Sequence, residues 1–473
     1  MKSAAMTTTK TAAPWLAWTF TIVGCCALLL RLGWVHYKWH IDELEYQEAI
    51  EEADRLDPGW RLADLEAARA AIPDEENSAL QVLTVHQLMP KNWLPPPQAS
   101  TECLEYTIDE LSPRQSLDEK RSQELDDELQ KVSEAVVAAR RLADMPRGRY
   151  NLIWSKDAVF TLLPHLDAVE EVLRLLWLDA VHQTQHGDIE AALTSCRALL
   201  NTGRSIGDEP ASASQVRRLR SQDYAMKSLE RALAHGEPSH ADLQALERLL
   251  QDESEQPLLL IAARGERAIW DQFLNVLKAG ELDRAALWWR YLTRRSVELE
   301  DALDKKRAHA THGASLKYFN EYVENCKLRF EQQLHRQSRY SMPKLEECTT
   351  LFEGCCFGGS IEDLLTLGFG RRLALIRSAI TALAVERYRL QNRCWPDRLE
   401  DLVPNYLNSI ATDPIDGHAL RYRHLADGVV IYSVGLDRID DGGNIERVKF
   451  KEPGTDIGFQ LWNPERRRQV SAK

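Results

Sequence analysis

Apolar positions in residues 371–392 recur at steps of three and four, which predicts an amphipathic helix. Leu373, Ile376 and Ile380 fall on one face of this helix, whereas arginines and other polar residues occupy the remainder. Pro396 ends the pattern, because proline lacks an amide hydrogen and pushes the preceding residue out of the helical region. The apolar face of such a helix needs a partner.

Beyond this helix the pattern changes to the alternation typical of strands. Apolar and basic residues alternate in residues 419–424, and residues 429–434 are rich in β-branched side chains. The pair Asp427 and Gly428 between them is a strong hairpin signal. Residues 445–450 are a candidate third strand. We therefore predict a three-stranded antiparallel sheet that packs on the helix and forms a small α+β unit.

The amino-terminal pattern is different, since residues 14–30 carry no charge and residues 32–35 extend the apolar run across Arg31. Roughly 20 helical residues at about 1.5 Å each span a hydrocarbon core of about 30 Å, which predicts a transmembrane helix. No small-x-small cleavage site follows, so an uncleaved signal anchor is favoured. The alternative is a lipoprotein cleavage site at Cys25.

Between these two ends the chain is predicted to be helical. Residues 41–145 are acidic and contain turn signals, which favours short helices with solvated acidic faces. In the following region, segments that start at Gly187 and Gly280 resemble each other, and Ser239 opens a capping box. Stacked helical hairpins are expected. Their surfaces would either bind partner proteins or serve as a plain structural bundle.

Composition narrows the function classes. The formal net charge is −13, which gives no support for a nucleic-acid partner. Nine cysteines form no paired C-x-x-C ligand sets, and buried or idle thiols are the favoured interpretation. A disulfide between Cys348 and Cys355 or Cys356 is the alternative in an oxidising compartment.

Candidate catalytic residues are few. His182 and His186 share a helix face at the spacing of a zinc pair, but no glutamate lies between them to serve as the base of a metalloprotease. Capping or surface histidines are therefore the favoured interpretation. His309 and His312 are expected in a solvated segment. The chain contains no Gly-x-Ser-x-Gly elbow, phosphate loop or dinucleotide fingerprint, so we do not predict an enzyme.

The carboxyl-terminal unit resembles the soluble part of the major pseudopilins of the type II secretion system. The resemblance covers roughly a sixth of the chain and rests on Glu386-Arg387-Tyr388-Arg389-Leu390-Gln391-Asn392, Trp395-Pro396, Leu399-Glu400-Asp401-Leu402-Val403-Pro404, Asp413-Pro414, Gly417, Leu420-Arg421-Tyr422-Arg423, Tyr432-Ser433-Val434-Gly435, Asp437 and Asp440-Asp441-Gly442-Gly443. The whole chain is similar to uncharacterised bacterial membrane-anchored proteins that carry this unit. Its position at the end of a long chain argues against a filament subunit.

The resemblance implies a calcium site in the late acidic loop. By position, the ligands fall on Asp437 and on Asp440 or Asp441, with Asn444 and free carbonyls beside them. The chemistry is reasonable, because calcium takes six to eight oxygen ligands from a flexible loop. The alternative is a solvated hairpin loop whose acids face water.

These observations predict a mainly α protein with a small carboxyl-terminal α+β unit. Its expected parts are a signal anchor with a transmembrane helix (1–40), an acidic juxtamembrane region (41–145), an α-helical, repeat-like domain (146–355), a pseudopilin-like unit (368–450) and a tail (451–473).

The resemblance implies a single-pass protein of the bacterial inner membrane with its bulk outside the cytoplasm. We expect a structural or protein-interaction function, linked to secretion machinery, with protein partners on the helical domain. The alternative is a membrane-tethered hydrolase or metalloenzyme.

Overall fold

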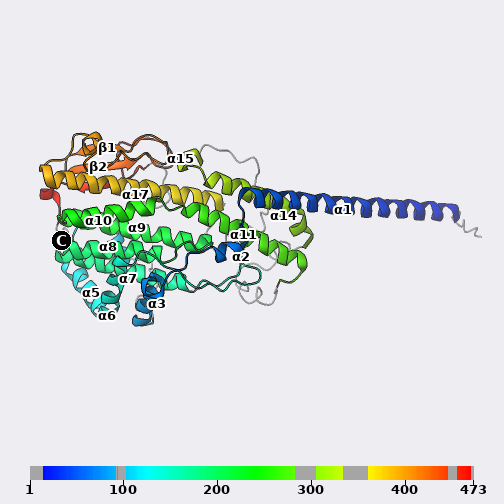
Figure 1. The fold of residues 1–473 in the computed structure, drawn as a ribbon, viewed down its shortest axis with the longest axis horizontal. Coiled ribbons are helices and arrows are strands. Elements are labelled where there is room, and N and C mark those ends of the chain that lie inside the picture. The colour runs from blue at the N-terminus through cyan, green and yellow to red at the C-terminus, as the bar shows by residue number, and fades with distance from the viewer. Residues whose placement is uncertain are drawn as a thin grey trace, which may run out of the picture.

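The computed structural model describes residues 14–91, 93, 103–282, 305–333, 361–445 and 455–469. These residues are mainly helical, with one three-stranded antiparallel sheet near the carboxyl end (Figure 1). The elements are α1 (Pro14–Leu56), α2 (Leu62–Ala67), α3 (Ser78–Leu88), α4 (Leu104–Glu110), α5 (Glu119–Gln130), α6 (Ser133–Arg140), α7 (His165–His186), α8 (Ile189–Arg204), α9 (Ser212–His235), α10 (His240–Ser254), α11 (Leu258–Ala279), α14 (Lys305–Cys326), α15 (Phe330–Gln333), α17 (Ile361–Asn392), β1 (Arg421–Leu425), β2 (Gly428–Ser433) and β3 (Ile457–Trp462). The predicted combination of a mainly α chain and a small antiparallel sheet is confirmed.

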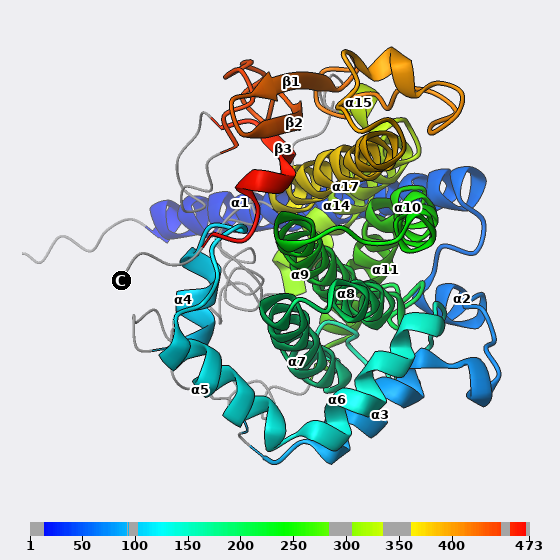
Figure 2. The same cartoon turned by 90° about the vertical axis from the view of Figure 1, so that its left-hand side faces the viewer.

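A bundle formed by α7 to α11 is the centre of the molecule, and Figure 2 shows it end-on with α3 to α6 along one side. Local signals begin and end these helices. Asp188 caps α8 by accepting from the amide of Ala191, and the predicted capping box at Ser239 is confirmed by a 3.1 Å bond from the amide of Asp242. Gly280 ends α11 in the left-handed conformation, with φ of 73°. The second copy of the predicted repeat runs from there into residues outside the described ranges.

The predicted amphipathic helix lies within α17, and the sheet packs against it. Ile376, Ile380 and Leu383 are buried. The predicted hairpin is confirmed, since β1 pairs antiparallel with β2 and the last pair of that register joins Leu425 to Gly428. The central strand β2 is buried along its whole length, as expected for a strand with neighbours on both edges.

The third strand differs from the prediction. Apart from its first residue, the predicted strand at 445–450 lies outside the described residues. The strand that pairs with the other edge of β2 is β3, in the segment predicted to be a tail. The sequence analysis places no strand there, whereas Ile457, Phe459 and Leu461 are buried and complete the sheet. Farther along the chain, the guanidinium of Arg467 lies 2.9 Å from the buried carboxylate of Glu386 on α17.

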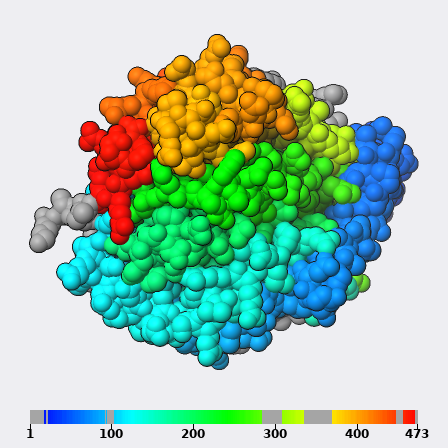
Figure 3. Space-filling model, turned by 60° about the vertical axis from the view of Figure 1, so that its left-hand side comes forward, coloured from blue at the N-terminus to red at the C-terminus, as the bar shows by residue number. Residues whose placement is uncertain are grey.

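One hydrophobic core joins the predicted helical domain to the predicted terminal unit. It runs without a break from Ala79 on α3, through α7 to α10 and α17, to Leu461 on β3. In the space-filling view the carboxyl-terminal unit (orange) lies directly on the bundle (green), with the α4 to α6 segments (cyan) on the opposite side (Figure 3). The sheet unit is therefore a layer of one packed body.

No helix among the described residues is long and apolar enough to cross a membrane. The predicted transmembrane helix in residues 1–40, and with it the predicted single-pass location in the bacterial inner membrane, is wrong on this finding. The apolar run is interrupted at Arg31, and α1 continues without a break into charged residues such as Lys38 and Asp42. Farther along, α1 packs Tyr46 and Ala49 into a small core with Leu316 of α14.

Candidate metal centre

The last two turns of α7 bring His182 and His186 together. The helical repeat places residues four apart on one face, and the two imidazole centroids lie 4.4 Å apart. Gly187 ends the helix immediately afterwards in the left-handed conformation, with φ of 83°, which a residue with a β-carbon adopts only at a cost. Both rings therefore occupy the carboxyl-terminal end of α7, where the helix dipole favours positive charge.

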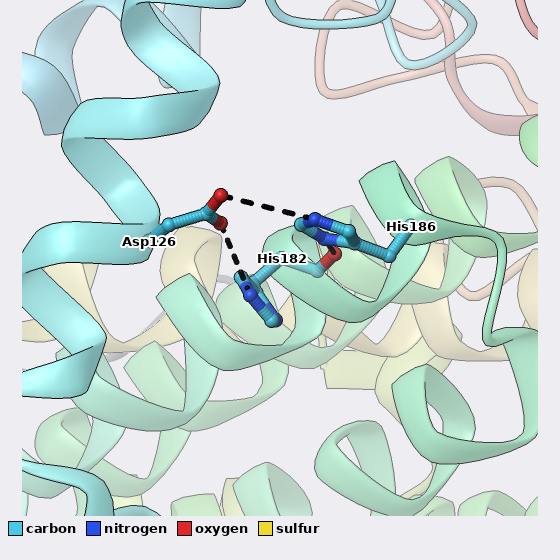
Figure 4. A group of neighbouring side chains, drawn as sticks. All are labelled: Asp126, His182 and His186. Atoms are coloured by element: carbon cyan, nitrogen blue, oxygen red, sulfur yellow. Dashed lines mark hydrogen bonds and ion pairs between the residues drawn. The ribbon is translucent and has the colours of Figure 1, made fainter.

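A carboxylate from another helix completes the group. Asp126 on α5 lies with one oxygen 3.1 Å from Nε2 of His182 and the other 3.8 Å from Nε2 of His186 (Figure 4). Leu125 and Leu129 anchor α5 by burying their side chains in the main core, which fixes the position of Asp126 between them. One ligand atom from each of the three residues lies within 4.8 Å of the others, and the described residues contain no other such group.

Hydrogen bonds fix the tautomer of each ring. Nδ1 of His186 lies 2.9 Å from the carbonyl oxygen of His182, which only accepts, so this nitrogen donates and Nε2 of the neutral ring carries a bare lone pair. Nδ1 of His182 accepts from the amide of Gln183 at 3.1 Å. That amide also donates to Asp179, which holds its orientation.

The electrostatics around Asp126 favour a proton or a cation between the carboxylate and His186. The Asp126 oxygen beside His182 is buried and has no hydrogen bond of normal geometry, although the protonated Nε2 of His182 lies 3.1 Å from it. The other oxygen faces the lone pair of His186, an arrangement that is repulsive unless a proton or a metal ion lies between them. Burial lowers the pKa of His182, so its ring is neutral at pH 7. For Nε2 to bind a metal ion, the ring proton must move to Nδ1, and the amide of Gln183 must then turn its oxygen toward that nitrogen.

Two imidazoles and one carboxylate suit a first-row divalent metal better than calcium, which prefers oxygen ligands. Three protein ligands on a tetrahedral ion leave one position open to solvent. The side chains are between about a quarter and a half exposed, so an ion can reach them. Gln183 occupies the position where a zinc protease has its glutamate base.

The four predicted calcium ligands, Asp437, Asp440, Asp441 and Asn444, lie in the acidic loop after β2. Asp437 accepts from the amide of Ile439, while Asp440 accepts from the hydroxyl of Tyr432 and the amide of Gly442. These acids and Asp441 do not form a group of three with ligand atoms within 4.8 Å among the described residues. Calcium binding stays a prediction.

Asp456 organises this acidic loop, and the sequence interpretation missed it. Its carboxylate accepts from the amides of Asp441 at 3.3 Å and Gly443 at 2.7 Å, and its own amide donates to the carbonyl of Asn444. Burial raises the pKa of Asp456, and the charges of Asp440 and Asp441 act in the same direction. The sequence signal that could have identified Asp456 is its position directly before the alternating apolar residues of β3.

In the second pair of histidines, His312 is buried and His309 is largely covered, so the predicted solvated segment is wrong there. His312 is 1 % exposed, stacks on Tyr46 of α1 and lies with Nε2 2.9 Å from the carboxylate of Asp271. His309 stacks in the same way on Trp39. The basic residues before this pair suggested solvent, whereas the aromatic side chains of α1 cover both rings.

Six cysteines in the described residues are free thiols, and Cys196 and Cys326 among them are buried. The alternative disulfide at Cys348, Cys355 and Cys356 lies outside the described residues.

Comparisons with known proteins found no matching family model, no matching curated protein and no matching solved structure. The resemblance to pseudopilins and the link to secretion machinery therefore stay predictions.

Proposed function

We propose that this protein is a helical scaffold whose α5 and α7 are joined by one zinc ion held by Asp126, His182 and His186. The convergence of three ligand atoms from two helices that lie far apart in the sequence carries this proposal. It is supported by the buried oxygen of Asp126, which has no hydrogen bond of normal geometry, and by the lone pair of His186 that faces the same carboxylate. A zinc ion between Asp126, His182 and His186 would accept a lone pair from each of the three side chains.

The role of the ion would be structural, in line with the structural or interaction function expected from the sequence. α5 is short and reaches the main core through few buried side chains, so a link to α7 would hold it in place. Binding energy realised only in the folded state adds to folding stability. The open fourth position offers a place for a ligand atom from solvent or from a protein partner.

Zinc titration of the full chain after chelator treatment, in competition with a chromophoric chelator, tests the proposal. We expect one site. Its affinity should fall about 100-fold or more when the ligand is removed in Asp126→Ala or His186→Ala, since even outer-shell changes cost 10- to 100-fold. The matched control is Asp416→Ala, because Asp416 lies 3.3 Å from His418 and also pairs with Arg421 but lacks a second histidine. Equal zinc affinity in all variants would contradict the proposal.

Amide hydrogen exchange tests the structural role separately. If zinc joins the two helices, its addition should slow exchange in α5 and leave α10 and α11 unchanged. If zinc binds with the expected affinity but does not slow exchange in α5, the metal site is supported and the structural role is wrong.

The same open position supports a second candidate, a metal-dependent hydrolase. In this case Gln183→Glu, which introduces the missing base, should increase hydrolysis of a generic ester by the zinc-loaded protein. If neither the parent chain nor this variant hydrolyses the ester, the hydrolase is contradicted and the structural role stays the proposal.

A further inference from the structure

A small cavity of about 20 Å³ lies beside α7 and α9, next to the loop that follows α4. It is lined by the apolar residues Ile108, Leu111, Pro113, Trp177 and Val181 and by the polar residues Asp109, Lys227, Ser228 and Arg231. A cavity of this size holds one small ion or about one or two water molecules. None of the proposed zinc ligands lines it.

Arg231 brings a buried positive charge to this cavity. Its side chain is buried, and its guanidinium donates to the carbonyl of Gln115 at 2.9 Å and to that of Ser112 at 3.5 Å. Among the described residues it forms no ion pair, and the charge of Asp109 offsets the effect of burial only in part. Carbonyl oxygens satisfy hydrogen-bond donors without neutralising the charge, and an uncompensated buried charge is costly. Burial accordingly lowers the pKa of Arg231 to about 10.

Ser228 adds a donor that has no partner among the described residues. It is 2 % exposed, and its hydroxyl is buried without a hydrogen bond. Buried helical hydroxyls normally bond to a carbonyl one turn earlier, as Thr202 does on α8. An unsatisfied hydroxyl at the wall of a cavity points to a ligand that accepts hydrogen bonds.

The charges around the cavity select a monovalent anion. Lys227 pairs with Asp109 at the half-exposed rim, which cancels both charges. Arg231 then remains with one positive charge. Burial and the charge of Arg231 lower the pKa of His235, one turn farther along α9, to about 4, so this residue is neutral at pH 7 and adds no charge.

We propose that this cavity binds one monovalent anion of the size of chloride, held by the guanidinium of Arg231 and the hydroxyl of Ser228. The small volume and the single positive charge of Arg231 favour one small monovalent anion, since the rim pair of Lys227 and Asp109 adds no net charge. The loop contacted by Arg231 also bonds to the chain end through Ser116 and Gln469 at 2.8 Å. The anion would therefore stabilise the junction between this loop, α9 and the carboxyl-terminal segment.

Chloride titration of the full chain at constant ionic strength, with sodium gluconate as the replacement salt, tests the proposal. We expect the urea unfolding midpoint to rise with chloride and to saturate, and the ³⁵Cl resonance to broaden and then narrow again when bromide is added. Ser228→Ala should reduce the chloride response, and Arg231→Gln should abolish it. Arg217→Gln is the matched control on α9, since Arg217 is paired with Glu170 away from the cavity, and it should keep the full response.

Identical unfolding midpoints in chloride and gluconate would overturn the proposal. A chloride response of full size in both Ser228→Ala and Arg231→Gln would overturn it equally. If Arg231→Gln does not fold, the Ser228→Ala titration and its ³⁵Cl line width decide the question. None of these results depends on zinc, so the outcome is separate from that of the proposed metal centre.

Discussion

The end of α7 and the acidic loop after β2 both carry side chains that bind metals in other proteins, but the fold uses them differently. At the end of α7, two histidines and an aspartate face one another with unsatisfied groups between them. In the loop, carboxylates accept hydrogen bonds from nearby backbone amides. Residue type alone therefore does not define a metal site, because a carboxylate can accept hydrogen bonds from nearby backbone amides instead of binding an ion.

The backbone explains this difference. A helix satisfies its own amides, so the side chains of His182 and His186 remain available to an external ligand. The acidic loop lacks regular backbone pairing, and its amides need acceptors. Asp437 and Asp440 each accept from the amide two residues later, which is the usual turn-forming bond of aspartate.

Among the changes that test this difference between the two regions, Asp456→Ala should have the largest effect on stability. This change leaves the amides of Asp441 and Gly443 without their acceptor. At roughly 1 kcal/mol for each bond, the free energy of unfolding should fall by about 2 kcal/mol in urea denaturation. Asp437→Ala is the control, since it removes one exposed bond and should cost no more than about 0.5 kcal/mol. Equal losses would mean that the loop is not organised by Asp456.

A change in pH should affect zinc binding to a smaller extent. Zinc needs neutral imidazoles, so protons compete with it once the pH falls below the ordinary histidine value of about 6.5. The pKa of His182 is lowered, which means that full affinity persists above pH 6.5 and is lost progressively as the pH falls. We expect a loss of roughly 10-fold between pH 7 and 5.5, measured by competition titration. An affinity independent of pH would contradict imidazole ligation.

Local sequence signals predicted the parts of the fold that depend on nearby residues. The apolar steps at Ile376 and Ile380, the hairpin at Gly428 and the capping box at Ser239 are all confirmed, because each depends on contacts within a few residues. The spacing of His182 and His186 on one helix face could be predicted for the same reason.

Contacts between distant segments could not be predicted in this way. Asp126 lies in an acidic stretch that has the pattern of a solvated face, and only the packing of α5 on α7 brings it to the histidines. His312 is buried because Tyr46 from the other end of the chain covers it. The strand β3 joins the sheet after a long connection, which no local turn signal indicates.

The smallest expected effect concerns calcium, which the resemblance places in the acidic loop. At a calcium concentration equal to the dissociation constant, a single site adds about 0.4 kcal/mol to the free energy of unfolding. If the prediction is correct, calcium should produce such a gain in the parent chain and none in the double variant Asp440→Ala with Asp441→Ala. Asp416→Ala, outside the loop, should retain the gain. An unfolding midpoint that is the same in calcium and in chelator would show that bonds between the carboxylates and the loop amides stabilise the loop without an ion, which would make the calcium prediction wrong.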